Sequence, residues 1–495
     1  MTSWPMRMVL KGVLTAAVWA VALSASVDRV QAQDYRGWTT SSVQMVELRP
    51  LGLDTVSSAD VEATSDGRFL YDGLEVTCAP GGTCTGYLPL DVDRTVAATQ
   101  DVGLTYWGLG VEGLSVTALG RVRLHVGSDI VWPRSDDEFD AILAYAQLNR
   151  GAVRVRAGRQ DVRSGLGLSA FDGLSASYSF GSARGEVYGG RSLARGLREP
   201  ANEALQGLDD FFLDHSVLLL GASASVRSFG IVATARYHRE ILWDRSSLVS
   251  ERAAFDFSTV LTRVRIRGSV DYDFSFQQVG KAELTASAPL ADGRWLVEVS
   301  GRRYVPYFDL STIWGFFEPV SYSELIGRVS WSATSSLGVS VSGGARSYGN
   351  TETTVILEPM RDNGWRADAG ARWQPTERWS INGRYELEWG PGGFLNSGDA
   401  TARYQVNDRL GASVSALTFQ QIEEYRLGEG RAFGGGASVD YDWNDRITAM
   451  AGFSMIKHRD GGNVFTSPWN QARAWTSLRF ELGGDPGLAN RGGAR

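Results

Sequence analysis

Polar and apolar side chains alternate along residues 262–276. Every second residue is polar or small on one side, from Arg263 to Ser275, and mostly β-branched or aromatic on the other, from Val264 to Phe276. Because a β-strand turns successive side chains to opposite faces, this pattern predicts a strand with one charged face and one apolar face. Strands of a transmembrane β-barrel face lipid on one side and water on the other over about 10 residues. The stretch therefore predicts a barrel strand.

The same alternation recurs from about residue 99 onward. Residues 365–373 and 379–389 each begin and end with tryptophan on the apolar face, while arginine and acidic residues occupy the other face. Residues 114–126 and 472–482 follow the same pattern. Tryptophan is typical of the levels at which a barrel meets lipid headgroups. We predict an all-β fold, an antiparallel transmembrane β-barrel in the outer membrane of a Gram-negative-type bacterium.

Turn-forming residues set the expected number of strands. Short turns alternate with mostly longer connections, as periplasmic turns alternate with extracellular loops in outer-membrane barrels, and they predict about 22 strands, within a range of about 18 to 22. Residues 99–482 form most of this predicted barrel, and residues 483–495 are predicted to be a disordered tail. Residues 33–98 are predicted to hold the first strand, near 42–49, and a long surface loop. The alternative is a small periplasmic module.

The first residues of the chain are those of a secretory signal peptide, predicted over residues 1–32. Arg7 and Lys11 precede an apolar core, and small residues before Gln33 form a cleavage site. Outside this segment no apolar run reaches the roughly 20 residues of a spanning helix.

Cys78 and Cys84 are the two cysteines of the chain, and turn-forming residues separate them. An exported protein enters an oxidising compartment, and no histidine neighbours the pair. The spacing therefore predicts a local disulfide rather than a metal or redox site.

The remaining composition gives little sign of catalysis. A formal net charge of -7 argues against nucleic acid as a partner. The histidines lie in unrelated segments, and no nucleophile elbow, metal-ligand spacing or phosphate-binding loop appears. We expect no catalytic residue, no metal and no cofactor. The alternative of a lipid hydrolase stays open, because it needs only a serine and a histidine close together at one rim.

Arginines on the predicted water-facing side are the main functional signal. Guanidinium groups in a water-filled pore attract carboxylates, phosphates and sulfates. Residues 263–267 carry the densest row, a candidate anion ladder. The alternative is a network of cross-strand ion pairs that only supports the wall. The predicted pore-lining residues are Arg121, Arg123, Arg154, Arg156, Arg263, Arg265, Arg267, Arg366, Arg372 and Arg384.

Aromatic residues gather in a predicted long loop within residues 302–322. Exposed rings can stack on a sugar or hold an apolar ligand, and they can equally anchor at the headgroup level or cover the barrel as a lid. The candidates are Tyr304, Tyr307, Phe308, Trp314, Phe316 and Phe317.

Within residues 157–191, Gly158-Arg159-Gln160 stands at a predicted strand end and Phe171-Asp172-Gly173 at the start of the next predicted strand. With these residues the segment resembles a strand pair of alginate-export-type and related substrate-selective outer-membrane porins. The resemblance implies a diffusion channel for a sugar, an acidic polysaccharide or another small polar solute, and transfers no particular substrate.

Together these features predict a porin-like channel for passive diffusion of small polar solutes, with anions and saccharides as candidates. Its expected partners are outer-membrane lipid, the barrel assembly machinery and the solute, and the sequence leaves the oligomeric state open. Active import is disfavoured because residues 33–98 are too few for a plug domain. A polysaccharide export conduit and a structural or adhesive surface barrel are the alternatives.

Overall fold

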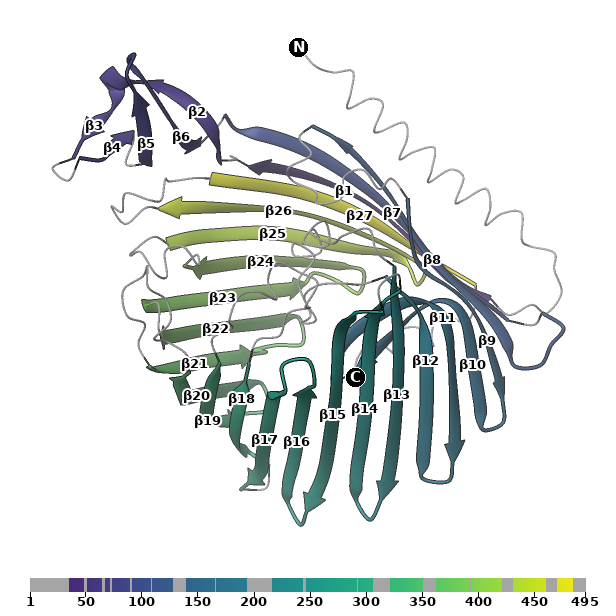
Figure 1. Ribbon diagram of the computed structural model, residues 1–495. Helices are drawn as coiled ribbons and strands as arrows, with labels where there is room; N and C mark the ends of the chain where they lie inside the picture. The colour runs from purple at the N-terminus through teal and green to yellow at the C-terminus, as the bar shows by residue number, and fades with distance from the viewer. Residues whose placement is uncertain are drawn as a thin grey trace.

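The computed structural model contains a closed antiparallel β-barrel of 22 strands and a small sheet of five strands (Figure 1). Strand β1 pairs with β7 on one side and with β27 on the other, which closes the ring. Closure leaves no unpaired strand edge in the lipid. The predicted fold class and strand number are confirmed. The barrel strands are β1 (Tyr35–Leu48), β7 (Asp93–Trp107), β8 (Leu114–Val126), β9 (Phe139–Arg150), β10 (Val153–Ser164), β11 (Gly167–Phe180), β12 (Ala183–Ser192), β13 (Val217–Ser228), β14 (Ile231–Leu242), β15 (Leu248–Leu261), β16 (Val264–Asp273), β17 (Gln278–Leu290), β18 (Trp295–Tyr304), β19 (Tyr322–Ser332), β20 (Leu337–Tyr348), β21 (Asn363–Trp373), β22 (Trp379–Gly390), β23 (Gly393–Gln405), β24 (Leu410–Phe419), β25 (Arg431–Asn444), β26 (Ile447–Arg459) and β27 (Asn470–Leu482).

The description that follows is limited to part of the chain. The structure describes residues 35–48, 51–64, 67–71, 74–89, 91–107, 109–127, 139–164, 166–193, 216–243, 246–291, 293–305, 321–349, 362–390, 393–420, 431–459 and 470–483. No helix among these residues has the length and apolar character needed to cross a membrane. The predicted signal peptide, and the predicted tail beyond residue 483, lie outside the described residues.

The two faces of the barrel wall differ as the alternation predicts. Directly opposite residues of antiparallel strands share a face, and Trp365 of β21 lies opposite Trp389 of β22 on the outer one. Large apolar side chains on this face are exposed, among them Leu174 at 62% and Val341 at 55%. Such an extended apolar surface is stable against hydrocarbon and unfavourable in water. The outer face is therefore the lipid-facing one, and the charged inner face encloses the lumen.

Strand β16 is shorter than the alternation of residues 262–276 predicts. Thr262 has a φ of 58° and forms, with Arg263, the tight turn that joins β15 to β16. At the other end, the carboxylate of Asp273 accepts a hydrogen bond of 3.1 Å from the backbone N–H of Phe276, which helps to close the turn before β17. The polar-apolar alternation continues through both tight turns, so the pattern alone overestimates the strand.

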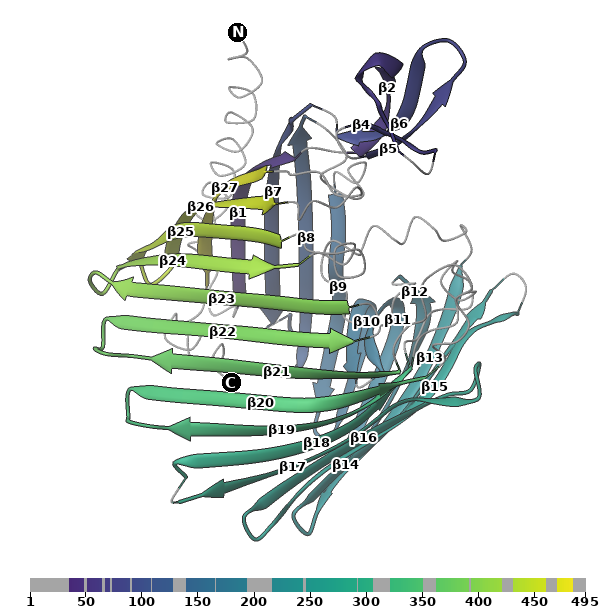
Figure 2. The ribbon, with the colours of Figure 1, turned by 90° about the vertical axis from the view of Figure 1, so that its left-hand side faces the viewer.

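The two ends of the barrel have different connections. At one end, which we call the short-turn end, tight turns join pairs such as β13 and β14 or β25 and β26. At the other end, the long-loop end, most connections are longer, such as the one between Tyr304 of β18 and Tyr322 of β19. Figure 2 shows the hairpins of the barrel wall from the side. This alternation is typical of outer-membrane barrels, in which the short turns face the periplasm.

The small sheet lies between β1 and β7 in the chain and projects from the long-loop end (Figures 1 and 2). Cys78 and Cys84 lie opposite each other on β5 and β6 and form the predicted disulfide. Leu74, Val76 and Leu88 are buried with Cys84 in the core of this sheet. Residues 33–98 thus contain both a barrel strand and this sheet. Its strands are β2 (Leu51–Ser57), β3 (Glu62–Ala63), β4 (Phe69–Tyr71), β5 (Leu74–Ala79) and β6 (Thr83–Pro89), with one 3-10 turn at Ser58–Asp60.

Candidate functional site

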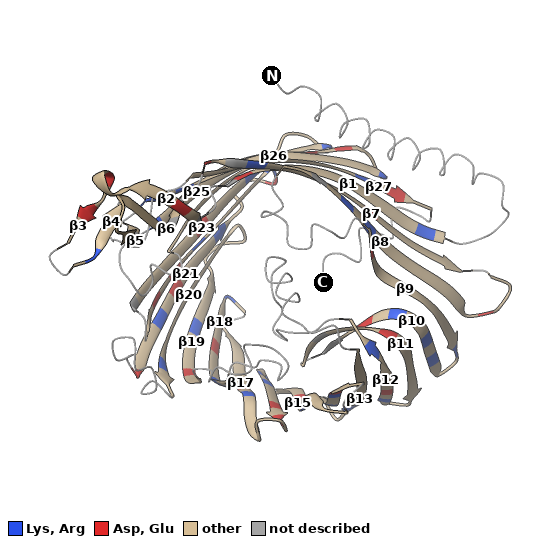
Figure 3. Ribbon diagram, turned by 45° about the horizontal axis from the view of Figure 1, so that its top comes forward, with Lys and Arg blue, Asp and Glu red and all other residues tan. Residues whose placement is uncertain are grey.

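The candidate functional site is the inner wall of the barrel, where the arginines predicted on strands lie. The register of the strands places these residues on the face opposite the apolar one. Arg265, for example, lies opposite Ser287, and Arg372 lies opposite Asn382. Figure 3 shows that basic and acidic residues lie on strands around the ring. Arg263 is the exception, because it lies in the turn before β16. The inner-wall residues are Arg121 and Arg123 of β8, Arg154 and Arg156 of β10, Arg265 and Arg267 of β16, Arg366 and Arg372 of β21, and Arg384 of β22.

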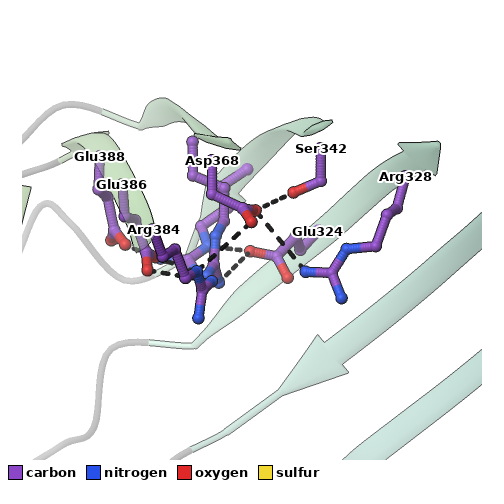
Figure 4. A network of polar contacts seen from close by, with 9 residues as sticks. Glu324, Arg328, Ser342, Asp368, Arg384, Glu386 and Glu388 are labelled. Carbon is purple, nitrogen blue, oxygen red and sulfur yellow. Dashed lines mark hydrogen bonds and ion pairs between the residues drawn. The ribbon is translucent and has the colours of Figure 1, made fainter. Parts of the chain in front are cut away.

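A dense group of ion pairs occupies the inner faces of β19 to β22 (Figure 4). Arg346 donates from Nε to Glu324, and its Nη1 lies 2.5 Å from Oε1 of Glu388. Arg366 Nη2 lies 2.6 Å from Oε1 of Glu386, and its Nη1 lies 3.7 Å from Oε2 of Glu324. One carboxylate, that of Glu324, is therefore shared between two arginines from neighbouring strands.

The same group continues around the carboxylate of Asp368. This carboxylate accepts a hydrogen bond from the hydroxyl of Ser342, and it lies 3.5 Å from Nε of Arg384 and 3.7 Å from Nη2 of Arg328. Arg384 Nη2 also lies 3.2 Å from Oε2 of Glu386. As many carboxylates as arginines take part, so their formal charges cancel. We call this set the matched network: Glu324, Arg328, Arg346, Arg366, Asp368, Arg384, Glu386 and Glu388.

Burial explains why these carboxylates need arginine partners. The side chains of Glu324 and Asp368 are only 4% and 6% exposed. An ionised carboxylate withdrawn from water is stable only when nearby cations and hydrogen-bond donors replace its hydration. Arg366 and Arg384 supply this compensation. The acidic partners neutralise these arginines within the wall. This geometry corresponds to the alternative stated in the sequence analysis, a network of cross-strand ion pairs.

Strands β7 to β9 hold a smaller group of matched charges. Nε and Nη2 of Arg121 contact the two oxygens of Asp101 at 2.7 and 3.1 Å, the bidentate geometry of a strong pair. Arg123 Nη2 lies 3.6 Å from Oδ2 of Asp140. These two predicted pore-lining residues therefore also have acidic partners.

Other predicted arginines lack a close carboxylate. Arg154 donates to the side-chain amide oxygen of Asn149 at 3.0 Å, and Arg156 donates to that of Gln147 at 2.6 Å. The guanidinium of Arg156 also lies over the ring of Tyr145, 5.2 Å from its centre. An amide or an aromatic ring orients a guanidinium group without removing its charge.

Strands β16 and β21 supply the rest of this group. Arg267 Nη2 lies 4.0 Å from Oε2 of Glu298, the limit of an ion pair. Within the described part of the chain, Arg265 and Arg372 have no carboxylate partner. Each of these residues lies within a few positions of a short turn. We call Arg154, Arg156, Arg265, Arg267 and Arg372 the unmatched arginines, because none of them has a carboxylate closer than 4.0 Å in the described part of the chain.

A buried polar group near the long-loop end of β14 to β16 was not among the predicted site residues. His238, Glu240, Arg252, Asp271 and Asp273 are each at most 7% exposed. Arg252 Nη2 lies 2.6 Å from Oδ2 of Asp271, and His238 Nε2 lies 3.6 Å from Oε1 of Glu240. Charged residues at alternate positions of β14 are the sequence signal that could have indicated this group.

Of the six predicted aromatic residues, Tyr304 is the one that lies among the described residues. Tyr304 ends β18, where the guanidinium of Arg302 lies 4.8 Å from its ring centre and the ring of Tyr322 lies 5.5 Å away. Tyr307, Phe308, Trp314, Phe316 and Phe317 lie outside the described residues. Among the described residues no group of histidine, cysteine and acidic side chains could hold a metal ion.

Residues 158–160 and 171–173 lie opposite each other within β10 and β11, and not at a strand end as predicted, because β10 continues to Ser164. Arg159 contacts both carboxylate oxygens of Asp172, at 2.8 and 2.9 Å, on the outer face of the wall. The motif therefore makes a cross-strand ion pair on the lipid side and contributes nothing from Arg159 to the inner wall.

No family model matches the chain, and no curated protein does. Solved structures give the fold. A variant of the ferric enterobactin receptor of Pseudomonas aeruginosa has a TM-score of 0.50 and 10% identity, over 92% of this chain and 82% of that one. The siderophore receptor PirA and the protein OpdQ, both of P. aeruginosa, have TM-scores of 0.44 and 0.36 and identities of 10% and 9%. PirA is matched over 92% of this chain and 81% of its own, and OpdQ over 91% and 99%.

The resemblance to alginate-export-type proteins is not shown by these structures. The likeness to the enterobactin receptor shows the architecture and no substrate. Together with the lipid-facing outer surface, it identifies the chain as a β-barrel of the Gram-negative outer membrane, as the sequence predicts.

Proposed function

We propose that this barrel is a non-enzymatic channel through which small polar solutes diffuse, and that the unmatched arginines make it prefer anions. The observation that carries the proposal is the absence, within the described residues, of a carboxylate partner for Arg265 and Arg372 on the inner wall. Charges of one sign lining a water-filled pore raise the local concentration of ions of the opposite sign.

Position strengthens the proposal. Arg154 and Arg156 follow the turn between β9 and β10, and Arg265 and Arg267 follow the turn between β15 and β16. The unmatched arginines therefore lie toward one mouth, which in outer-membrane barrels is the periplasmic one. A solute carrying a carboxylate or phosphate would meet guanidinium groups with free donors there. The solute class we propose is accordingly small organic and inorganic anions, acidic sugars included.

Ion selectivity in planar lipid bilayers tests this proposal. The barrel, inserted under a KCl gradient, should show a reversal potential that indicates chloride preference. In the double variant Arg265→Gln, Arg267→Gln this preference should fall by a factor of about two or more, since a unit charge at roughly 10 Å in water contributes about 0.4 kcal/mol.

A charge-neutral variant is the matched control. Asp101→Asn combined with Arg121→Gln removes one complete ion pair from the inner wall and should leave the preference unchanged. Equal selectivity in the wild type and the arginine variant would show that the unmatched arginines only support the wall. A barrel without any conductance would contradict the channel itself.

A further inference from the structure

Three cations lie together on the outer face, where β25 and β26 reach the long-loop end. The register places Arg431 directly opposite Arg459, and Phe433 opposite Lys457. Arg459 and Lys457 are exposed, and Arg431 is half-buried. We call Arg431, Lys457 and Arg459 the basic triad.

The triad belongs to the lipid-facing side of the wall. Its residues continue the row that contains Phe433, Met455 and Phe453, which are 44%, 47% and 50% exposed. In a β-strand every second side chain shares a face, so the apolar stripe that meets hydrocarbon ends in three positive charges. This is the level at which a barrel passes from the hydrocarbon core to the headgroups.

Three other arginines on the outer face near the long-loop end have acidic partners. Arg159 pairs with Asp172, Arg94 Nε lies 2.6 Å from Oε1 of Glu47, and Arg239 Nη1 lies 3.8 Å from Oε1 of Glu251. The triad has no carboxylate partner in the described part of the chain. Its nearest ring contact is that of the Arg431 guanidinium, 5.9 Å from the ring centre of Phe433.

Like charges directly opposite each other destabilise a pair of strands. Two guanidinium groups and a nearby ammonium group on one lipid-facing surface therefore favour an anion between them, and the described residues place no carboxylate there. Guanidinium forks bind phosphate oxygens in a bidentate manner, and an adjacent apolar surface suits acyl chains. We propose that the basic triad binds the phosphate groups of a phosphorylated lipid of the outer leaflet, with Phe433, Met455 and Phe453 against its acyl chains.

The continuity of cationic and apolar surface favours a lipid over a free phosphate ion. A small ion needs the charges alone, whereas here the charges end a stripe that hydrocarbon must cover. Lipid binding at this point would hold the β25–β26 hairpin against the membrane at the long-loop end. The inference is independent of the proposed channel, because the triad lies on the other face of the wall.

Retention of a defined lipid tests the proposal. The purified full-length barrel is mixed in detergent with bisphosphorylated lipid A and then re-purified, and the bound lipid is counted by native mass spectrometry. The triple variant Arg431→Gln, Lys457→Gln, Arg459→Gln should retain at least about tenfold less lipid A, because each cation contributes severalfold to binding an anionic lipid. The variant Arg265→Gln, Arg267→Gln, Arg372→Gln loses the same charge from the inner wall and should retain as much lipid as the wild type.

Two further measurements distinguish binding of the lipid phosphates from binding of acyl chains alone or of a free phosphate ion. Dephosphorylated lipid A should bind the wild type as weakly as lipid A binds the triad variant, and millimolar inorganic phosphate should not displace bound lipid A. The variant Arg431→Lys, Arg459→Lys keeps the three positive charges, so it should retain more lipid A than the triple glutamine variant. The electrophoretic mobility of each variant shows whether its barrel is folded. Equal retention by the wild type and the triad variant, or displacement by inorganic phosphate, would overturn the proposal.

Discussion

Two groups of arginines on the inner wall differ in their partners. On β19 to β22, Arg346 and Arg366 share Glu324, which is almost fully buried, and charges of both signs cancel across the strands. On β10 and β16, Arg154 meets an amide and Arg265 meets no acid in the described residues. The first arrangement satisfies buried carboxylates, and the second leaves positive charge facing water. The presence of arginine alone therefore does not make the wall attract anions. The neighbours of each arginine on the adjacent strands determine whether its charge is neutralised or faces water.

The largest effect should come from removing the shared carboxylate of the matched network. Glu324→Gln leaves Arg346 and Arg366 as two cations on neighbouring strands with one carboxylate fewer between them. Removing one partner from a buried ion pair typically costs about 3 kcal/mol or more. We expect the free energy of unfolding of the barrel to fall by roughly that amount, measured by the electrophoretic mobility of folded and unfolded barrel across a urea series.

An unmatched arginine supplies the control for this experiment. Arg265→Gln removes an exposed guanidinium that has no acidic partner in the described residues, so the free energy of unfolding should change by less than about 0.5 kcal/mol. If Glu324→Gln were no more destabilising than Arg265→Gln, the matched network would not stabilise the wall, and the contrast between the two groups of arginines would disappear.

An intermediate effect should follow when an unmatched arginine is given an acid. Ser287 lies directly opposite Arg265 on the inner face, so Ser287→Glu places a carboxylate across the strand from this guanidinium. The chloride preference should fall by a factor of about two, as it should when a unit charge is neutralised at roughly 10 Å from the ion path. The measurement is the reversal potential in planar bilayers.

Ser287→Gln is the matched control, because it adds a side chain of similar size without charge. It should leave the reversal potential unchanged. Similar shifts from Ser287→Glu and Ser287→Gln would mean that the shape of the pore, and not the pairing of Arg265, sets the selectivity.

The fold was predictable because its signal is local. Each barrel strand needs one apolar face and one polar face, and this requirement appears in consecutive residues such as 365–373. The disulfide was predictable for the same reason, since a short turn-forming spacer brings Cys78 and Cys84 together. The limits of strands were less predictable. Alternation continues through the turn at Thr262 and Arg263, so the predicted row of three arginines on β16 contains two on the strand.

The division of the arginines into matched and unmatched was not predictable from the sequence. Arg346 contacts Glu388, 42 positions later in the chain and two strands away in the sheet. Such a contact depends on the register of every intervening hairpin, and a slip of one residue would turn the partner to the other face. The sequence predicted which arginines face the lumen and left two interpretations open, anion attraction or ion pairing. Only the register shows which of these arginines have carboxylate neighbours.

The smallest effect should come from unbalancing the matched network at its more exposed edge. Glu388 is 21% exposed, and Arg346 keeps Glu324 when Glu388 is lost. Glu388→Gln should therefore cost less than about 1 kcal/mol of stability, as for a partly exposed pair. It adds one net positive charge to this arc, so chloride preference should rise by a factor of less than about two. Glu388→Asp keeps the charge and should leave selectivity unchanged. A fall in chloride preference in Glu388→Gln would show that net charge on the inner wall does not govern selectivity.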